Sequence, residues 1–146
     1  MQFNINTKRN IDMVIIHCSA TEAGNDYDIE HIRKWHVEGN GWSDVGYHFV
    51  IKLDGTIQEG RPIWRAGAHC KGKNMRSIGI CYIGGVRGGT PKDTRTEAQK
   101  VALLKLLKYI RKQYPGVGIY GHRDFANKNC PSFDATAEYF GLRGDD

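Results

Sequence analysis

Three residues of this chain have side chains that together could bind a metal ion: His17, His122 and Cys130. His17 follows the apolar run 13–16, His122 follows the run 119–121, and Cys130 comes a short polar loop later, directly before a proline. Two imidazoles and one thiolate suit zinc, and a set of three leaves the fourth position of a tetrahedral ion open for water. This arrangement is typical of catalytic zinc. His17 is distant from the other two in sequence, so the prediction depends on the fold.

The apolar pattern predicts the elements that must position these residues. Short apolar runs favour strands, expected at residues 13–19, 47–53, 77–83 and 119–122, with a return strand at 56–59 after a hairpin turn at Asp54 and Gly55. Helical periodicity and capping residues favour helices, expected at 28–39, from Thr94 or Thr96 to 114, and at 135–140. The alternation predicts a single α/β domain over residues 1–146. We expect a central mixed β-sheet of about five or six strands flanked by about three helices.

Two segments between these elements carry no clear pattern. Residues 61–76 are rich in Gly, His, Cys and Lys, and we expect them to be irregular. The glycine-rich segment 84–89 superficially suggests a phosphate-binding loop, but it lacks the Gly-Lys-Ser/Thr ending. We interpret it as a flexible connection from a strand to the long helix.

The composition indicates a globular protein with a basic surface. Of the 146 residues, 40% are hydrophobic and 25% are charged, which is enough to bury a core without disulfides. The net charge of +5 is spread along the chain, which suggests either a solvated surface or attraction to a polyanion such as an anionic cell wall. No nucleic-acid partner is expected, because neither an RNA-binding motif nor a helix-turn-helix pattern accompanies the charge.

The cysteines and the N-terminus bear on the cellular compartment. Cys18, Cys70, Cys81 and Cys130 form no CxxC pair, and we expect free thiols with at least one bound to metal. No apolar stretch has the length of a membrane span, and no signal peptide is visible. We therefore expect a monomer that is cytoplasmic as synthesised and reaches a cell wall only if released or exported.

Two further polar residues, Tyr47 and Lys128, are candidates for the site. In the strand expected at 47–53, alternation places Tyr47 on the face of Phe49 and His48 on the opposite face, so that His48 is expected in the core or behind the site. Tyr47 begins this strand and could reach a neighbouring strand end. Lys128 precedes Cys130 by two residues. Taken alone, Tyr47 is better explained as a core or rim aromatic residue than as a catalyst, and Lys128 as a surface lysine.

Six segments together resemble one known family. In chain order they are HCSAT (17–21), GYHF (46–49), DGTIQEGR (54–61), AGAH (66–69), NMRSIGI (74–80) and KNCPSFD (128–134). They resemble the zinc N-acetylmuramoyl-L-alanine amidases, a family shared with peptidoglycan recognition proteins, and the match is closest to its short phage-lysozyme members. Each segment is weak evidence, but six in the right order, covering about residues 17–134, are highly specific.

The resemblance implies a bacteriolytic hydrolase that cuts the amide bond between N-acetylmuramic acid and L-alanine in peptidoglycan or muropeptides. It implies one zinc ion per chain, with His17, His122 and Cys130 as ligands and with Tyr47 and Lys128 as catalytic residues. Some members carry Asp where Cys130 stands. We expect Lys128 to stabilise the negative charge on the carbonyl oxygen, and Tyr47 to orient water or assist proton transfer.

His69, in the irregular segment, has two equally good interpretations. It is either an ordinary polar loop residue or a substrate contact, and we assign it to substrate binding.

Three alternatives compete with a zinc amidase. One is a non-catalytic recognition module that binds peptidoglycan, although such relatives are expected to lack a metal ligand. Another is a cysteine peptidase with Cys130 or Cys18 as nucleophile and His122 as base. The third is a structural zinc site, which would need a fourth protein ligand. The sequence leaves open whether the substrate is intact wall or a soluble fragment.

Overall fold

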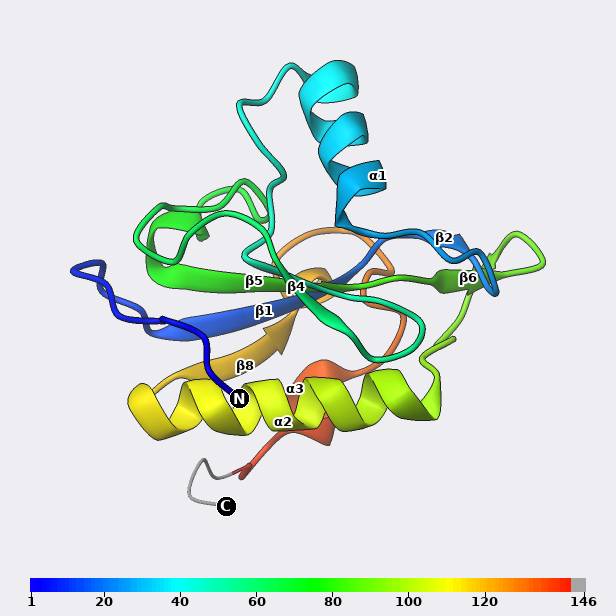
Figure 1. Ribbon diagram of the computed structural model, residues 1–146. Helices are drawn as coiled ribbons and strands as arrows, with labels where there is room; N and C mark the ends of the chain where they lie inside the picture. The colour runs from blue at the N-terminus through cyan, green and yellow to red at the C-terminus, as the bar shows by residue number, and fades with distance from the viewer. Residues whose placement is uncertain (143–146) are drawn as a thin grey trace.

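A five-stranded mixed sheet forms the centre of the computed structural model, which describes residues 1–142 (Figure 1). Its strands are β1 Met13–Cys18, β3 Phe49–Ile51, β4 Ile57–Glu59, β5 Ser77–Tyr82 and β8 Gly118–Gly121. They lie in the order β4-β3-β5-β1-β8. β1 is parallel to both β5 and β8, β3 is parallel to β5, and only the hairpin partner β4 runs antiparallel. The predicted mixed sheet is confirmed, with five strands.

Helices cover both faces of this sheet. The long helix α2, Glu97–Gln113, lies across one face, and α1, Ile29–Lys34, rises from the other, while the short α3, Ala135–Glu138, lies near β8 (Figure 1). The larger hydrophobic core lies between the sheet and α2, and it includes Val14, Ile16, Phe49, Ile51, Leu103, Leu106 and Leu107. The smaller core lies under α1 and includes Ile29, Ile32, Val50 and Cys81. No helix in the described part of the chain is long and apolar enough to cross a membrane.

Helix α2 begins with a capping box, which settles the start that the sequence left at two positions. Thr96 is the N-cap, and its hydroxyl accepts the backbone N–H of Gln99 at 3.0 Å, while Gln99 accepts the N–H of Thr96 at 2.9 Å. The buried Gln99 amide also donates to the carbonyls of Ile51 and Ile83. The cap therefore anchors the helix to the ends of two strands.

The first helix differs from expectation at its end. Asp28 caps it as predicted, but from Trp35 to Gly39 the chain continues as a π-helix, with wider turns than an α-helix. Trp35, the first residue of the π-helix, is 39% exposed.

The glycine-rich segment 84–89 is more regular than predicted. It contributes β6, Gly85–Arg87, to a small sheet with β2, Thr21–Glu22, and β7, Thr90–Pro91. This sheet lies beyond the carboxyl end of β1 (Figure 1). The segment 84–89 therefore lies next to the carboxyl end of β1, which carries His17.

Candidate metal centre

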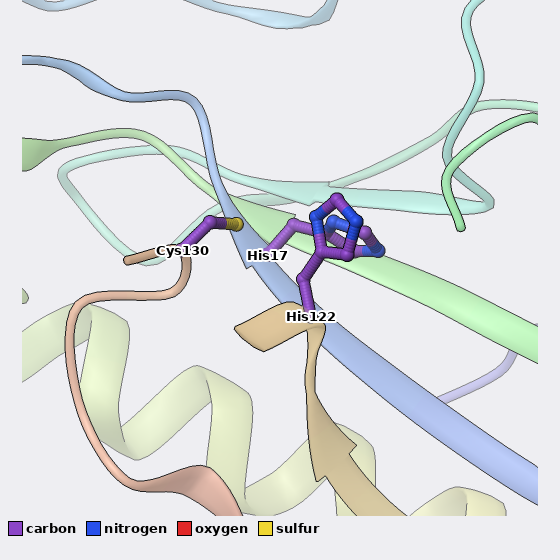
Figure 2. A group of neighbouring side chains, drawn as sticks. All are labelled: His17, His122 and Cys130. Atoms are coloured by element: carbon purple, nitrogen blue, oxygen red, sulfur yellow. The ribbon is translucent and has the colours of Figure 1, made fainter. Parts of the chain in front are cut away.

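Two parallel strands bring His17 and His122 together. Ile16 of β1 pairs with Gly121 of β8, so the next residues, His17 within β1 and His122 directly after β8, lie at the same edge of the sheet. Their ring centroids are 4.6 Å apart (Figure 2). Such carboxyl ends of parallel strands are where α/β sheets commonly bind ligands. His17 lies on the face of the sheet opposite to Ile16, because side chains alternate along a strand.

Cys130 reaches this pair from the loop that follows β8. Its sulfur points toward the two imidazoles (Figure 2), and it accepts the backbone N–H of Cys18 at 3.2 Å. One ligand atom from each of His17, His122 and Cys130 lies within 4.8 Å of the other two. Ligand atoms held at about 2.0–2.3 Å from a single zinc ion must lie close together, and these three form such a cluster. The structure thus brings the predicted set together, and the donor set of two nitrogens and one sulfur fits zinc.

The protonation of these groups also suits a metal. Burial lowers the pKa of His17 well below its ordinary value, and burial followed by the charge of Lys128 lowers that of His122. Both rings are therefore neutral near pH 7, and neutral imidazole is the form that coordinates. A hydrogen bond with the Cys18 thiol and burial raise the pKa of Cys130 in the metal-free protein. A bound metal must therefore displace the thiol proton.

The segment after Cys130 is fixed by contacts on both sides. The Tyr82 hydroxyl donates to the carbonyl of Pro131 at 2.6 Å, and the Ser132 hydroxyl donates to the carbonyl of Gly85 at 2.9 Å. These bonds tie the ligand segment to β5 and β6. The sulfur of Cys130 is consequently held on a rigid support.

A buried arginine supports the same segment from below. The Arg95 side chain is only 2% exposed, and its guanidinium carbon lies 3.5 Å from the ring centroid of Phe133. It pairs with Asp93 at 2.9 Å and with Glu138 at 2.8 Å, and it donates to the Tyr139 hydroxyl at 3.0 Å. This cluster joins the start of α2, the ligand segment and α3.

We expect Arg95→Met to lower the free energy of unfolding at pH 7 by about 3 kcal/mol, because it removes a paired, buried cation and leaves the carboxylates of Asp93 and Glu138 without this partner. The bond to Arg95 lowers the pKa of Glu138. A carboxylate whose pKa is lower in the folded state stabilises the fold above its unfolded pKa of about 4.3, and the effect is lost as the pH falls. The difference in free energy of unfolding between wild type and Arg95→Met should therefore become smaller below about pH 4.

Urea unfolding at pH 7 and in acid measures this difference. The matched control is Lys100→Met, which removes an exposed pair with Glu97 at 3.6 Å and should change the stability by less than about 0.5 kcal/mol. An Arg95→Met protein as stable as the control would contradict the role given to the cluster.

Tyr47 lies beside the ligands, although not by the predicted route. Strand β3 begins only at Phe49, so the expected alternation from residue 47 is wrong. Phe49 faces the α2 core, whereas Tyr47 packs with Val50 on the α1 side. Its ring centroid is 5.0 Å from that of His17. Burial raises the pKa of Tyr47 well above its ordinary value, so the phenol keeps its proton.

A cavity of about 440 Å³ adjoins the ligands. Its lining includes His122 and the exposed lysines Lys71 and Lys128, together with the aromatic side chains of Trp42 and Phe125. The sequence analysis identified Lys128 but missed the other lysine and both aromatic residues. They lie in separate loops with no shared motif, so only the fold reveals their proximity.

The remaining histidines are placed as follows. His48 is 1% exposed, and its ring accepts the N–H of Gly79 at 3.1 Å, in agreement with the prediction of a core position. His69 is also buried, and burial lowers its pKa to about 3. Both ring nitrogens of His69 bond to protein groups, His17 and Ser77. The residue also lines the cavity beside His122, so its assignment to substrate binding stays a prediction.

The irregular segment 61–76 is held by two arginines that the sequence analysis missed. Arg9 donates to the carbonyl of Ile63 at 2.9 Å and to that of Ser77 at 3.2 Å. Arg61 is buried and donates to the carbonyl of Val45 at 2.7 Å. No local signal distinguishes these arginines from surface ones, because their partners are backbone carbonyls distant in sequence.

Comparison with known proteins agrees with this arrangement. The family described as N-acetylmuramoyl-L-alanine amidase matches residues 7–133. The endolysin of Klebsiella phage KP32 is 46% identical over 130 residues, which cover 88% of this chain and 85% of that protein. Among solved structures, the N-acetylmuramoyl-L-alanine amidase LysC from Clostridium intestinale is 28% identical with a TM-score of 0.74, covering 94% of this chain and 90% of that one. Bumblebee PGRP-SA is 26% identical with a TM-score of 0.76, covering 96% and 90%.

Proposed function

This chain belongs to the N-acetylmuramoyl-L-alanine amidase family, and we propose that it hydrolyses its substrate with one zinc ion held by His17, His122 and Cys130. The chain is a hydrolase that acts on peptidoglycan, and the bond cut is the amide between N-acetylmuramic acid and L-alanine. We propose that it works as a monomer on the cell wall.

The proposal that the protein binds a catalytic zinc ion depends on one observation. Three ligand atoms of the kinds that zinc prefers lie within 4.8 Å of one another, at the edge of a cavity large enough for part of a glycopeptide. A structural zinc site would be closed by a fourth protein ligand. Among the described residues the cluster consists of three. The arrangement therefore favours catalysis over a purely structural role.

The chemistry divides between the metal and the protein. Zinc, when bound, lowers the pKa of a coordinated water to about 7 and polarises a carbonyl group. We assign Lys128 to stabilising the negative charge that develops on the carbonyl oxygen of the scissile amide, since its ammonium lines the same cavity as His122. We assign Tyr47, beside His17, to orienting water or assisting the transfer of a proton to the leaving amine.

We place the substrate in the cavity next to His122. The aromatic side chains of Trp42 and Phe125 offer flat apolar contacts for sugar or peptide, and Lys71 offers a charge for an acidic group. Lys73 lies over the Phe125 ring, 5.0 Å from its centroid, and adds a second charge nearby. This surface suits an anionic wall polymer better than a neutral ligand.

The competing functions fit these contacts less well. A cysteine peptidase would need a base bonded to its thiol, but the hydrogen bonds of the Cys130 sulfur go to Cys18 and not to a histidine. A recognition module without activity has no need of a complete ligand set or of Lys128 beside it. The same fold does occur in bumblebee PGRP-SA, so experiment must separate binding from hydrolysis.

Metal analysis combined with digestion of purified sacculi tests the proposal. We expect about one zinc per chain and release of peptides that begin with L-alanine, identified by mass. Activity should disappear on chelation and return with zinc. A zinc-loaded protein that binds sacculi without releasing peptides would favour the recognition module. Activity that survives complete removal of metal would favour the peptidase.

A further inference from the structure

A chain of hydrogen bonds runs from His17 into the protein interior. Nε2 of His17 lies 2.8 Å from Nδ1 of His69, and Nε2 of His69 lies 3.0 Å from Oγ of Ser77. The three residues are 1%, 8% and 0% exposed. A neutral imidazole has one N–H and one lone pair. Each bond in this chain therefore determines which nitrogen of the neighbouring ring carries the proton.

The bond to His69 determines which atom of His17 is available to a metal. Because Nε2 of His17 is occupied by His69, Nδ1 is the nitrogen left to coordinate. Coordination requires a lone pair on Nδ1, so the proton must reside on Nε2 and be donated to Nδ1 of His69. His69 then carries its own proton on Nε2 and donates it to Ser77.

We propose that His69 is a positioning residue, which fixes the ring orientation and tautomer of His17 for metal binding. The inference rests on the proposed metal site. It gives His69 a role that its two hydrogen bonds support, behind the ligand His17. Partners of this kind orient a ligating histidine and increase its basicity.

The fold provides a slot for the His69 ring. A Cβ atom on Gly79 would lie 2.6 Å from Cδ2 of His69, and a Cβ on Gly67 would also lie 2.6 Å from that atom. Any side chain at either position would therefore displace the ring. The side chain of Asn74 accepts the backbone N–H groups of His69 and Cys70, at 2.9 and 3.0 Å. Ring and backbone are thus held independently, as a positioning role requires.

The neighbouring His48 provides a matched comparison. It is as buried as His69, and their ring centroids are 6.1 Å apart. Its nitrogens bond to the backbone of Gly79 and Arg65 instead of to a metal ligand. Loss of either ring leaves a similar gap in the interior, but only loss of His69 removes a partner from His17.

Zinc affinity of the folded proteins, measured by competition with a chromogenic chelator, tests the proposal. We expect His69→Leu to bind zinc about 10- to 100-fold more weakly than wild type. His69→Asn, whose side-chain oxygen can occupy the place of Nδ1, should recover most of this loss. His48→Leu should bind zinc as wild type does. Equal affinity of wild type and His69→Leu, or equal losses in His69→Leu and His48→Leu, would overturn the proposal.

A spectroscopic measurement on the wild-type protein needs no substitution. Long-range ¹H–¹⁵N spectra of the zinc-loaded protein should show His17 protonated at Nε2, with a slowly exchanging proton that is lost in His69→Leu. A His17 protonated at Nδ1 would overturn the inference. Wild-type protein that binds no zinc would instead refute the proposed metal site, so the two failures are distinguishable.

Discussion

Replacing Cys130 by alanine is expected to abolish stoichiometric zinc binding and to lower amidase activity by more than about 10³-fold. The two histidines that remain offer one ligand fewer than a catalytic zinc site needs. Without the metal, no group of the protein makes water a strong nucleophile at neutral pH. The contacts of the flanking segment, from Tyr82 to Pro131 and from Ser132 to Gly85, do not involve the sulfur, so the variant should still fold.

Two further substitutions, Cys130→Asp and Cys81→Ala, serve as comparisons for Cys130→Ala. Cys130→Asp offers a carboxylate oxygen, which is also a zinc ligand, and should retain zinc together with part of the activity. Cys81→Ala removes a buried thiol that is outside the ligand set and should keep its zinc. Zinc content by atomic emission and peptide release from sacculi measure both effects. Full activity of zinc-free Cys130→Ala would refute the proposed site and favour neither a zinc amidase nor a Cys130 nucleophile.

Lys128→Ala is expected to lower kcat by about 10²- to 10³-fold while zinc content stays normal. The reason is loss of the ammonium beside the developing negative charge, a stabilisation that matters more in the transition state than in the bound substrate. KM should change much less than kcat. Kinetics on a soluble muropeptide, with zinc measured on the same samples, separates these quantities.

Lys71→Ala is the matched control, since Lys71 is an exposed lysine on the same cavity. It removes the same charge from the cavity and should act mainly on KM. Tyr47→Phe removes the phenol hydroxyl and keeps the ring packed beside His17. If Lys128→Ala and Tyr47→Phe were both fully active, the catalytic roles given to these residues would be wrong. Equal losses of kcat in Lys128→Ala and Lys71→Ala would indicate a general electrostatic effect of positive charge in the cavity instead of a specific role for Lys128.

The local elements of this fold could be predicted because their signals are local. The apolar run before His17 predicts β1, and the capping residues of the long helix predict its start to within two residues, Thr94 or Thr96. The hairpin that joins β3 and β4 follows from Asp54 and Gly55. Each of these depends on neighbours within a few residues, so composition and periodicity are sufficient.

The path of the chain around the site was less predictable. Tyr47 lies beside His17 because β3 begins at Phe49, two residues later than the apolar pattern indicates. The first helix also departs from its pattern and continues as a π-helix from Trp35 to Gly39. In both cases tertiary packing outweighed a weak local preference. The segment 84–89 likewise forms a strand because β2 and β7 pair with it.

The sequence by itself determined the residue types for a zinc site and the strand ends that carry two of them, together with the family to which the six segments point. Only the tertiary structure decided that these residues meet. The pairing of β1 with β8 joins segments about a hundred residues apart, and such a parallel register is set by packing between strands rather than by either strand alone. The same nonlocal packing places His69 behind His17, a relation that no pattern along the chain encodes.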